Sequence, residues 1–230
     1  MEKAKLTVNG LASMIDHTLL KPYAAEDDFK KLCAEAAQYK FKMVAINSSA
    51  VTMCKELLKG SGVLVGAAIS FPFGQTTIDT KVYETMESIK NGADEIDYVV
   101  NIVELKKKNY EYIEKEMKHV VDACRSSGRT VKVIFENCYL TDDEKKALCN
   151  IALKVRPDFI KTSTGFGTGG ATVEDVRLMK SIVGDKVKVK AAGGIRTVEK
   201  ALQMIEAGAE RIGTSSGIKI IEGYKKYLNK

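Results

Sequence analysis

The feature that most constrains the fold is a regular alternation of short apolar segments with longer amphipathic segments along the chain. The short segments are rich in β-branched residues and have the length of buried strands. Eight of them occur, at residues 14–18, 43–47, 63–70, 95–101, 131–136, 158–161, 187–190 and 211–214. The sequence therefore predicts eight strands, with room for a helix between one strand and the next.

The intervening segments carry apolar residues at helical spacing and predict helices. These helices cover residues 26–39, 49–59, 77–91, 110–127, 142–154, 173–183 and 198–207. The TDDE segment from Thr141 to Glu144 matches a capping box, and Gly92 and Gly208 each follow a helix, where a glycine can take the left-handed closing conformation. Eight strand–helix units fit a chain of 230 residues, because (β/α)8 barrels typically have about 250. The alternation therefore predicts an α/β fold, a single-domain (β/α)8 TIM barrel over residues 1–230.

Two observations favour one barrel over other arrangements. No linker or low-complexity segment divides the chain, so one domain is expected. A doubly wound sheet would need fewer strands and usually has a glycine-rich first turn, which this sequence lacks.

Charge and cysteine content limit the partners and the compartment. The 36 basic and 30 acidic residues are scattered, which suits a small anionic substrate better than nucleic acid. No apolar segment has the length of a membrane span or of a signal-peptide core. The five cysteines are odd in number and lack CxxC spacing. We therefore expect a cytoplasmic protein that binds neither nucleic acid nor a membrane.

Alternation along the strands places charged side chains inside the predicted barrel. In KVKVK at residues 186–190 the valines face the helices, so Lys188 and Lys190 point inward. The same alternation directs Lys161 and Asp97 inward. Enclosed charges need partners, so structural ion pairing is the interpretation for another set of inward residues: Lys132, Glu136, Glu95 and Lys188.

Lys161, Lys190 and Asp97 lie at or near the carboxyl ends of their strands, the rim where barrel enzymes place their chemistry. A neighbouring cation and partial burial both lower the pKa of a lysine. Lys161 beside Lys190 is therefore predicted to supply a neutral amine that forms a Schiff base, while Asp97 moves protons. The loop that follows Lys161 is small and polar, so Thr164 and Gly165 are predicted to contact the substrate.

A metal site is not indicated by the sequence. His17 and His119 are the only histidines, and neither HxH nor HExxH spacing occurs. Serine or cysteine catalysis lacks a credible histidine partner. We therefore predict an enzyme that uses no metal and no other cofactor.

Two glycine-rich loops predict a phosphate site. AAGGIRT at residues 191–197 follows the seventh strand, and GTSSG at residues 213–217 follows the eighth. Backbone amides at glycines and at helix amino termini bind anions, and barrels commonly hold phosphate in these two loops.

Six motifs resemble the deoxyribose-phosphate aldolases: IDHTLLKP, FPFG, NGADEIDYVVN, FIKTSTGF, VKAAGGIR and RIGTSS. The resemblance covers residues 11–220. It implies a metal-independent class I aldolase that reversibly cleaves 2-deoxy-D-ribose 5-phosphate into glyceraldehyde 3-phosphate and acetaldehyde, and it suggests a homodimer.

The resemblance also implies residue roles. Lys161 matches the Schiff-base lysine, Asp97 the proton donor and acceptor, and Lys190 the second lysine that activates them. The positions that match the phosphate-binding residues are Gly193, Gly194, Gly213, Ser215 and Ser216. Asp16 and Thr18 match polar residues near the substrate, and His17 is interpreted as a structural hydrogen-bonding group.

Two positions depart from the resemblance. Ala45 stands where many relatives carry a cysteine, which predicts lower sensitivity to unsaturated aldehydes. Phe166 stands where some relatives carry a lysine, which predicts that phosphate rests mainly on backbone amides and hydroxyl groups. The alternatives are another phosphate-binding barrel enzyme, transaldolase-like or a sugar-phosphate isomerase, and a catalytically silent metabolite-binding barrel.

Overall fold

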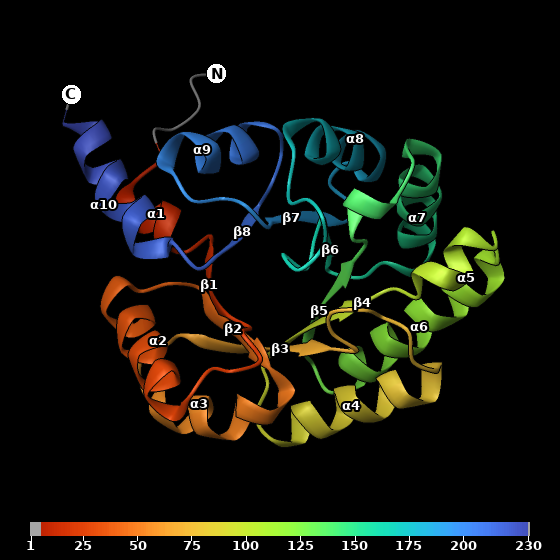
Figure 1. The fold of residues 1–230 in the computed structure, drawn as a ribbon, viewed down its shortest axis with the longest axis horizontal. Coiled ribbons are helices and arrows are strands. Elements are labelled where there is room, and N and C mark those ends of the chain that lie inside the picture. Colours follow the sequence, from red (N-terminus) through yellow and green to blue (C-terminus); the bar gives the residue numbers. More distant parts are fainter. Residues whose placement is uncertain (1–5, 230) are drawn as a thin grey trace.

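The strands form a closed parallel barrel in the computed structural model, which describes residues 6–229. They pair in chain order, and β8 pairs with β1 to close the sheet (Figure 1). The strands are β1 (Ile15–Leu19), β2 (Met43–Asn47), β3 (Leu64–Ile69), β4 (Glu95–Val99), β5 (Thr130–Ile134), β6 (Phe159–Lys161), β7 (Lys188–Ala192) and β8 (Arg211–Thr214). The predicted (β/α)8 barrel is confirmed. Its exact extent over residues 1–230 stays a prediction, because residues 1–5 and 230 lie outside the described part of the chain.

Helices surround the barrel (Figure 1). They are α1 (Val8–Ala12), α2 (Glu26–Tyr39), α3 (Val51–Leu57), α4 (Ile78–Lys90), α5 (Ile102–Lys106), α6 (Tyr110–Ser126), α7 (Asp142–Val155), α8 (Val173–Val183), α9 (Val198–Glu206) and α10 (Gly217–Leu228). The sequence patterns do not predict α1, α5 or α10. The N-cap of α10 is Ser216, which makes no side-chain capping bond. The start of this helix therefore lacks the threonine cap that marks several other helices.

Local sequence accounts for several element boundaries. Thr141 and Glu144 form the predicted capping box at the start of α7, with hydrogen bonds of 3.3 and 2.8 Å. Gly92 and Gly208 have φ angles of 108° and 112°, as the helix-ending pattern predicts. An added Cβ at Gly208 would lie 2.6 Å from the side chain of Lys180, so close packing as well as conformation favours glycine there.

Three strands end earlier than their apolar patterns predict, namely β3, β4 and β5. Ser70 and Glu136 take left-handed conformations, with φ of 49° and 59°. Asn101 caps α5 by accepting a hydrogen bond from the Glu104 amide at 3.3 Å. The chain therefore turns away at the carboxyl ends of these strands, and this end of the barrel carries the loops.

The apolar core lies between the barrel and the helices. Outward-facing strand residues such as Ile96, Tyr98, Val133, Ile160 and Val189 are completely buried there. Both faces of a parallel strand are covered, and here the face away from the helices carries charge. No helix within residues 6–229 is long and apolar enough to cross a membrane.

Candidate active site

The strand register brings the predicted catalytic residues together. Asp97 on β4 lies opposite Lys132 on β5, and Lys161 on β6 lies opposite Lys190 on β7. Lys190 in turn lies opposite Arg211 on β8. All of these side chains are buried. Charged residues from six strands thus meet on the barrel axis and form what we call the axial cluster: Asp16, Glu95, Asp97, Lys132, Lys161, Lys190 and Arg211.

Asp97 is the centre of this cluster. Its Oδ2 accepts hydrogen bonds from Lys161 Nζ at 2.8 Å and from Lys190 Nζ at 2.7 Å. Its Oδ1 accepts from Lys132 Nζ at 2.7 Å. The inward direction predicted for Asp97, Lys161 and Lys190 is confirmed, and the two lysines share one carboxylate oxygen.

Arg211 is a member that the sequence analysis missed. Its guanidinium contacts Asp16 Oδ1, with Nε at 2.9 Å, and also contacts both oxygens of Glu95 at 3.1 and 3.3 Å. The other oxygen of Asp16 lies 2.6 Å from Lys190 Nζ. Arg211 lies two residues before Gly213 on β8, so both share one face of the strand. Since Gly213 was assigned to the substrate site, alternation indicates that Arg211 also points inward. Arg211 therefore links Asp16 to Glu95, and Asp16 in turn contacts Lys190.

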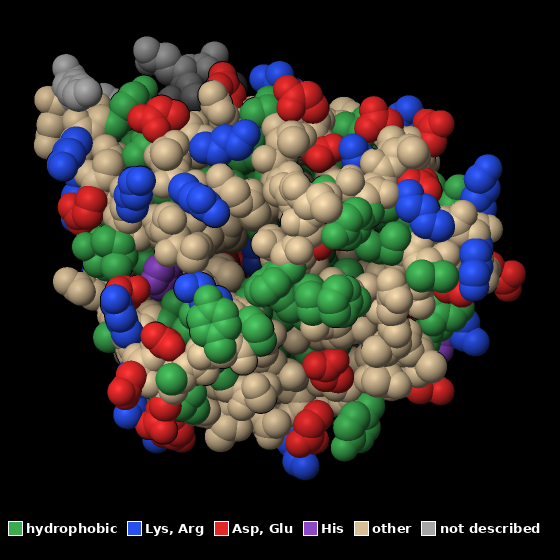
Figure 2. Space-filling view, viewed as in Figure 1, with side chains coloured by type: hydrophobic (Ala, Val, Ile, Leu, Met, Phe, Trp, Pro, Cys, Tyr) green, Lys and Arg blue, Asp and Glu red, His purple; other side chains and the backbone are tan. Residues whose placement is uncertain are grey.

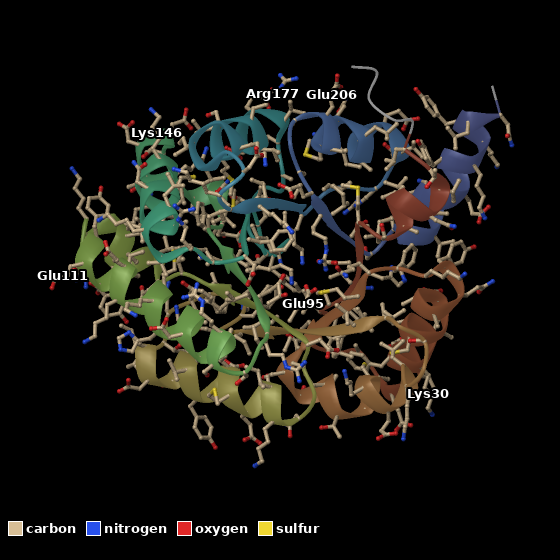
Figure 3. All side chains as sticks on the ribbon, turned by 180° about the vertical axis from the view of Figure 1, so that it is seen from behind. Lys30, Glu95, Glu111, Lys146, Arg177 and Glu206 are labelled. Atoms are coloured by element: carbon tan, nitrogen blue, oxygen red, sulfur yellow. The ribbon has the colours of Figure 1, made fainter. Side chains whose placement is uncertain are left out.

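The interior pairing predicted from the sequence holds for two of four residues. Glu95 and Lys132 form an ion pair within the axial cluster, and Glu95 lies at the centre of the ring of strands in Figure 3. Lys188 is instead exposed, because it is the first residue of β7 and lies at the open amino-terminal end; its Nζ lies 5.5 Å from the centroid of the Phe159 ring. Glu136 is buried beyond the end of β5 and bonds to Thr164 rather than to a cation.

The charges of the axial cluster do not cancel when every group is ionised, because four cationic side chains meet three carboxylates. Burial lowers the pKa of Lys161 from 10.5 to about 8, Asp97 opposes this shift, and Lys190 adds to it. A lysine with this pKa has about one amine in ten neutral at pH 7, against about one in three thousand at the ordinary value. Lys161 thus carries a partly neutral amine at pH 7.

Asp97 responds in the opposite direction. Burial by itself raises the pKa of this carboxyl group, but the ammonium groups of Lys132, Lys161 and Lys190 outweigh burial and hold its pKa well below the ordinary value. Asp97 therefore stays ionised at neutral pH, ready to accept a proton.

A cavity of about 510 Å³ opens above the two lysines. Its lining includes most of the predicted site residues, namely Thr18, Lys161, Thr164, Gly165, Lys190, Gly193, Gly194, Gly213 and Ser215. Asp16 and Asp97 do not line it, because they lie beneath Lys190 and Lys161 as their ion-pair partners. In the space-filling view, one face of the molecule is hollowed near its centre, and hydrophobic side chains gather beside the hollow (Figure 2).

The loop after β7 has a backbone conformation that favours glycine. Gly193 and Gly194 have φ angles of 86° and 75°, where residues with a Cβ are disfavoured. Arg196 also lines this part of the cavity. Ser216 does not, and its amide donates to Thr214 Oγ1 at 2.9 Å, so this amide already has a partner.

Two further residues at the cavity have defined contacts. His17 Nε2 lies 2.8 Å from Glu35 Oε2, which agrees with its interpretation as a structural hydrogen-bonding group. Phe166 is 48% exposed and packs edge-on against Phe71, with ring centroids 5.4 Å apart. The rim of the cavity is therefore apolar at Phe166.

Comparison with known proteins agrees with this geometry. A family model described as DeoC/LacD family aldolase matches residues 11–223. The chain belongs to the DeoC/LacD aldolase family. The resemblance recognised in the motifs is confirmed, and with it the aldolase class.

Individual members of the DeoC/LacD family are similar over nearly the whole chain. The deoxyribose-phosphate aldolase of Lactobacillus acidophilus is 59% identical over 96% of this chain and 93% of that protein. The deoxyribose-phosphate aldolase of Bacteroides thetaiotaomicron is 54% identical over 97% and 94%. The structure of the Aeropyrum pernix deoxyribose phosphate aldolase superposes with a TM-score of 0.89 at 33% identity, covering 96% of this chain and 93% of that one; it is described as a tetramer.

Proposed function

We propose that this protein is a deoxyribose-phosphate aldolase that cleaves 2-deoxy-D-ribose 5-phosphate into glyceraldehyde 3-phosphate and acetaldehyde, and catalyses the reverse condensation. The observation that carries the proposal is the buried Lys161 amine, which has a pKa of about 8, lines the cavity and bonds to Asp97. The names of the similar proteins support the choice of substrate.

The chemistry begins with the neutral amine of Lys161. Its lone pair attacks C1 of the open-chain sugar to form a carbinolamine. The carbinolamine hydroxyl then takes up a proton and leaves as water, which gives a protonated Schiff base. Removal of the proton from the C3 hydroxyl then breaks the C2–C3 bond, and the bonding electrons move into the iminium group to form an enamine. Glyceraldehyde 3-phosphate leaves, the enamine takes a proton at C2, and hydrolysis releases acetaldehyde and the free lysine.

Asp97 and Lys190 are assigned the supporting roles. Asp97 is ionised and contacts Lys161 Nζ at 2.8 Å, so it is placed to accept protons first and return them later. Lys190 contacts the same oxygen of Asp97 at 2.7 Å, and its positive charge disfavours a second ammonium at Lys161. Neither role requires a metal or another cofactor.

The sugar phosphate is assigned to the glycine loops. Gly193, Gly194, Gly213 and Ser215 line the cavity and offer backbone amides or a hydroxyl group, and Arg196 adds a positive charge. Ser216 is assigned a weaker part, because its amide is already bonded within the loop. Thr18, Thr164 and Gly165 are assigned to the bound sugar, and Asp16 acts through Lys190.

The cell context stays a proposal. We propose a cytoplasmic enzyme whose partners are the phosphorylated sugar and acetaldehyde, with assembly at least to a homodimer; the tetramer described for the Aeropyrum pernix protein supports assembly in general. The expected resistance to unsaturated aldehydes also stays a prediction, and an adduct near Ala45 with rapid inactivation would contradict it.

Mass spectrometry of borohydride-reduced adducts tests the proposed function. The protein is incubated with acetaldehyde or with 2-deoxy-D-ribose 5-phosphate, reduced and digested, and the modified peptide is sequenced. We expect both carbonyl compounds to modify Lys161, and the sugar phosphate to yield glyceraldehyde 3-phosphate in a coupled assay. An isomerase would convert sugar phosphates without an adduct, and a silent barrel would bind phosphate without turnover.

A further inference from the structure

Glu136 is a buried carboxyl group that differs from the other buried carboxyl groups. It is 2% exposed, and within residues 6–229 no lysine, arginine or histidine nitrogen forms an ion pair with it. Other buried carboxylates each contact a cation, as Asp16, Glu95, Asp97, Glu116 and Asp175 show. An enclosed carboxylate without a bonded cation is costly, so its retention needs a reason.

The partner of Glu136 is the loop that follows Lys161. Its Oε1 accepts a hydrogen bond from the Thr164 amide at 3.1 Å, and its Oε2 accepts from the Thr164 hydroxyl. Thr164 Oγ1 in turn accepts from the Phe166 amide at 3.0 Å. The carboxylate therefore holds Thr164 directly and Phe166 through the Thr164 hydroxyl, and both residues line the cavity.

The backbone at Glu136 is strained in a way that aims its side chain. Its φ is 59°, a left-handed conformation that costs a residue with a Cβ on the order of 1–2 kcal/mol. The residues on either side continue the ladder to β6, since Phe135 N donates to Lys161 O and Asn137 N donates to Thr162 O, both at 2.9 Å. The strain is thus confined to the one residue whose carboxylate meets Thr164.

The 162–170 loop also packs directly on the segment that carries Glu136. A Cβ added at Gly167 would lie 2.7 Å from Cys138 Sγ and 3.2 Å from Glu136 Cδ. A Cβ added at Gly169 would lie 3.1 Å from Cys138 Cβ. The loop reaches this close contact because both positions lack side chains, so its shape follows the Glu136 segment.

We propose that Glu136 is a positioning residue for the Schiff-base reaction at Lys161, holding the 162–166 loop through Thr164 and facing the lysine with a negative charge. This inference rests on the proposed function. The axial cluster is neutral when Lys161 is an amine, and it gains one positive charge when the lysine becomes an iminium. Glu136 is the carboxylate that compensates this charge.

The electrostatics of Glu136 agree with this role. Burial raises its pKa, while the hydrogen bonds from Thr164, the charge of Lys161 and the contact with Cys138 act in the opposite direction. The groups that face Glu136 are therefore Thr164, the Cys138 thiol at 3.9 Å and Lys161 through space. A cation at Lys161 favours the ionised form of Glu136, and ionised Glu136 favours the cation.

The Glu136→Gln variant tests the proposal. We expect kcat for the sugar phosphate to fall at least tenfold while KM rises less than threefold, because the loop is misplaced although the phosphate loops are intact. We also expect the midpoint of the pH dependence of acetaldehyde trapping at Lys161 to shift to lower pH, because a negative charge near the ammonium is lost. A variant with the wild-type kcat and the wild-type midpoint would overturn the proposal.

Matched variants separate positioning from damage to the fold. Glu116→Gln removes another buried carboxylate, one that does not line the cavity, and should leave the trapping midpoint unchanged. Thr164→Val removes the hydroxyl that bonds to Glu136 but keeps the charge of Glu136. We therefore expect kcat to fall while the trapping midpoint does not shift to lower pH. Thr164→Ser should recover most of the loss seen in Thr164→Val. Equal kcat in Thr164→Val and Thr164→Ser would contradict the positioning of the loop through the Thr164 hydroxyl, even if Glu136→Gln does not fold. Failure of the wild-type protein to trap acetaldehyde would instead contradict the proposed function.

Discussion

The axial cluster and the Lys81–Glu116 pair are both buried, but they differ in charge balance and in access. Lys81 on α4 donates to Glu116 Oε1 on α6 and to Val99 O, both at 2.7 Å. One cation faces one carboxylate, and neither residue lines the cavity. In the axial cluster three ammonium groups share Asp97, and two of them, Lys161 and Lys190, line the cavity.

The comparison separates burial from reactivity. Burial lowers the pKa of Lys81 as well as that of Lys161. Lys81 nevertheless has its own counter-charge and no route to a substrate. Lys161 competes with Lys132 and Lys190 for Asp97 and opens onto the cavity. An excess cation beside a cavity is therefore what makes one buried lysine a candidate nucleophile.

The largest expected effect comes from removing Lys161, with removal of Lys81 as the matched comparison. Lys161→Met should abolish borohydride trapping and lower turnover at least about 10,000-fold, because the covalent step is lost. Lys81→Met should keep trapping and should keep turnover per folded molecule within about threefold. Its free energy of unfolding should fall by about 3–5 kcal/mol, because Glu116 stays buried without its cation. Loss of acetaldehyde trapping in Lys81→Met would contradict the distinction drawn between Lys81 and Lys161.

A second variant tests the neighbouring cation. Lys190→Met should lower turnover at pH 7 by about 100-fold or more, because Asp97 loses one partner and Lys161 becomes easier to protonate. The midpoint for trapping at Lys161 should then rise above 8. Lys190→Arg keeps the charge and should keep the midpoint lower than Lys190→Met does; equal midpoints in the two variants would contradict the role given to this charge.

Arg211 tests the charge count away from the cavity. Arg211→Met removes one cation from the axial cluster without touching the cavity lining, so the trapping midpoint should rise and turnover at pH 7 should fall about tenfold. The variant should also lose about 3–5 kcal/mol of stability, because Asp16 and Glu95 lose a shared partner. An unchanged midpoint in a folded variant would show that only near neighbours set the pKa of Lys161.

A separate effect is expected on the stability of the unmodified protein rather than on its turnover. The folded pKa of Lys161 is about 8 and lies below the unfolded value of 10.5, so the unfolded chain binds more protons between these two pH values. The contribution of this group to stability is therefore lowest below pH 8 and rises by up to about 3 kcal/mol by pH 10.5. Denaturant unfolding of the wild type and of Lys161→Met across this range measures it. The stability difference between the two proteins should change with pH, and a constant difference would contradict the lowered pKa.

Much of the barrel and three of its key residues could be predicted from alternation along single strands. The apolar face of each strand is fixed by packing against helices, so Asp97, Lys161 and Lys190 had to point inward. Register between strands is different, because it depends on contacts far apart in sequence. Neither the sharing of Asp97 by three lysines nor the excess cation could be read from one strand.

Local backbone conformation and depth along the barrel could not be predicted from the sequence either. Glu136 continues the alternation of Lys132 and Ile134 in the sequence, but it lies beyond the end of β5, and its left-handed conformation turns its carboxylate to Thr164. Lys188 follows the alternation too, yet its position at the first residue of β7 leaves it exposed. Alternation thus predicts direction, while depth along the barrel comes from the three-dimensional structure.

The most direct test of the central claim is the pH dependence of reductive trapping by acetaldehyde, followed residue by residue with mass spectrometry. We expect Lys161 to carry the adduct and the rate of adduct formation to rise with a midpoint near pH 8, while Lys81 stays unmodified. A midpoint near the ordinary lysine value of 10.5, or an adduct mainly at another lysine, would contradict it.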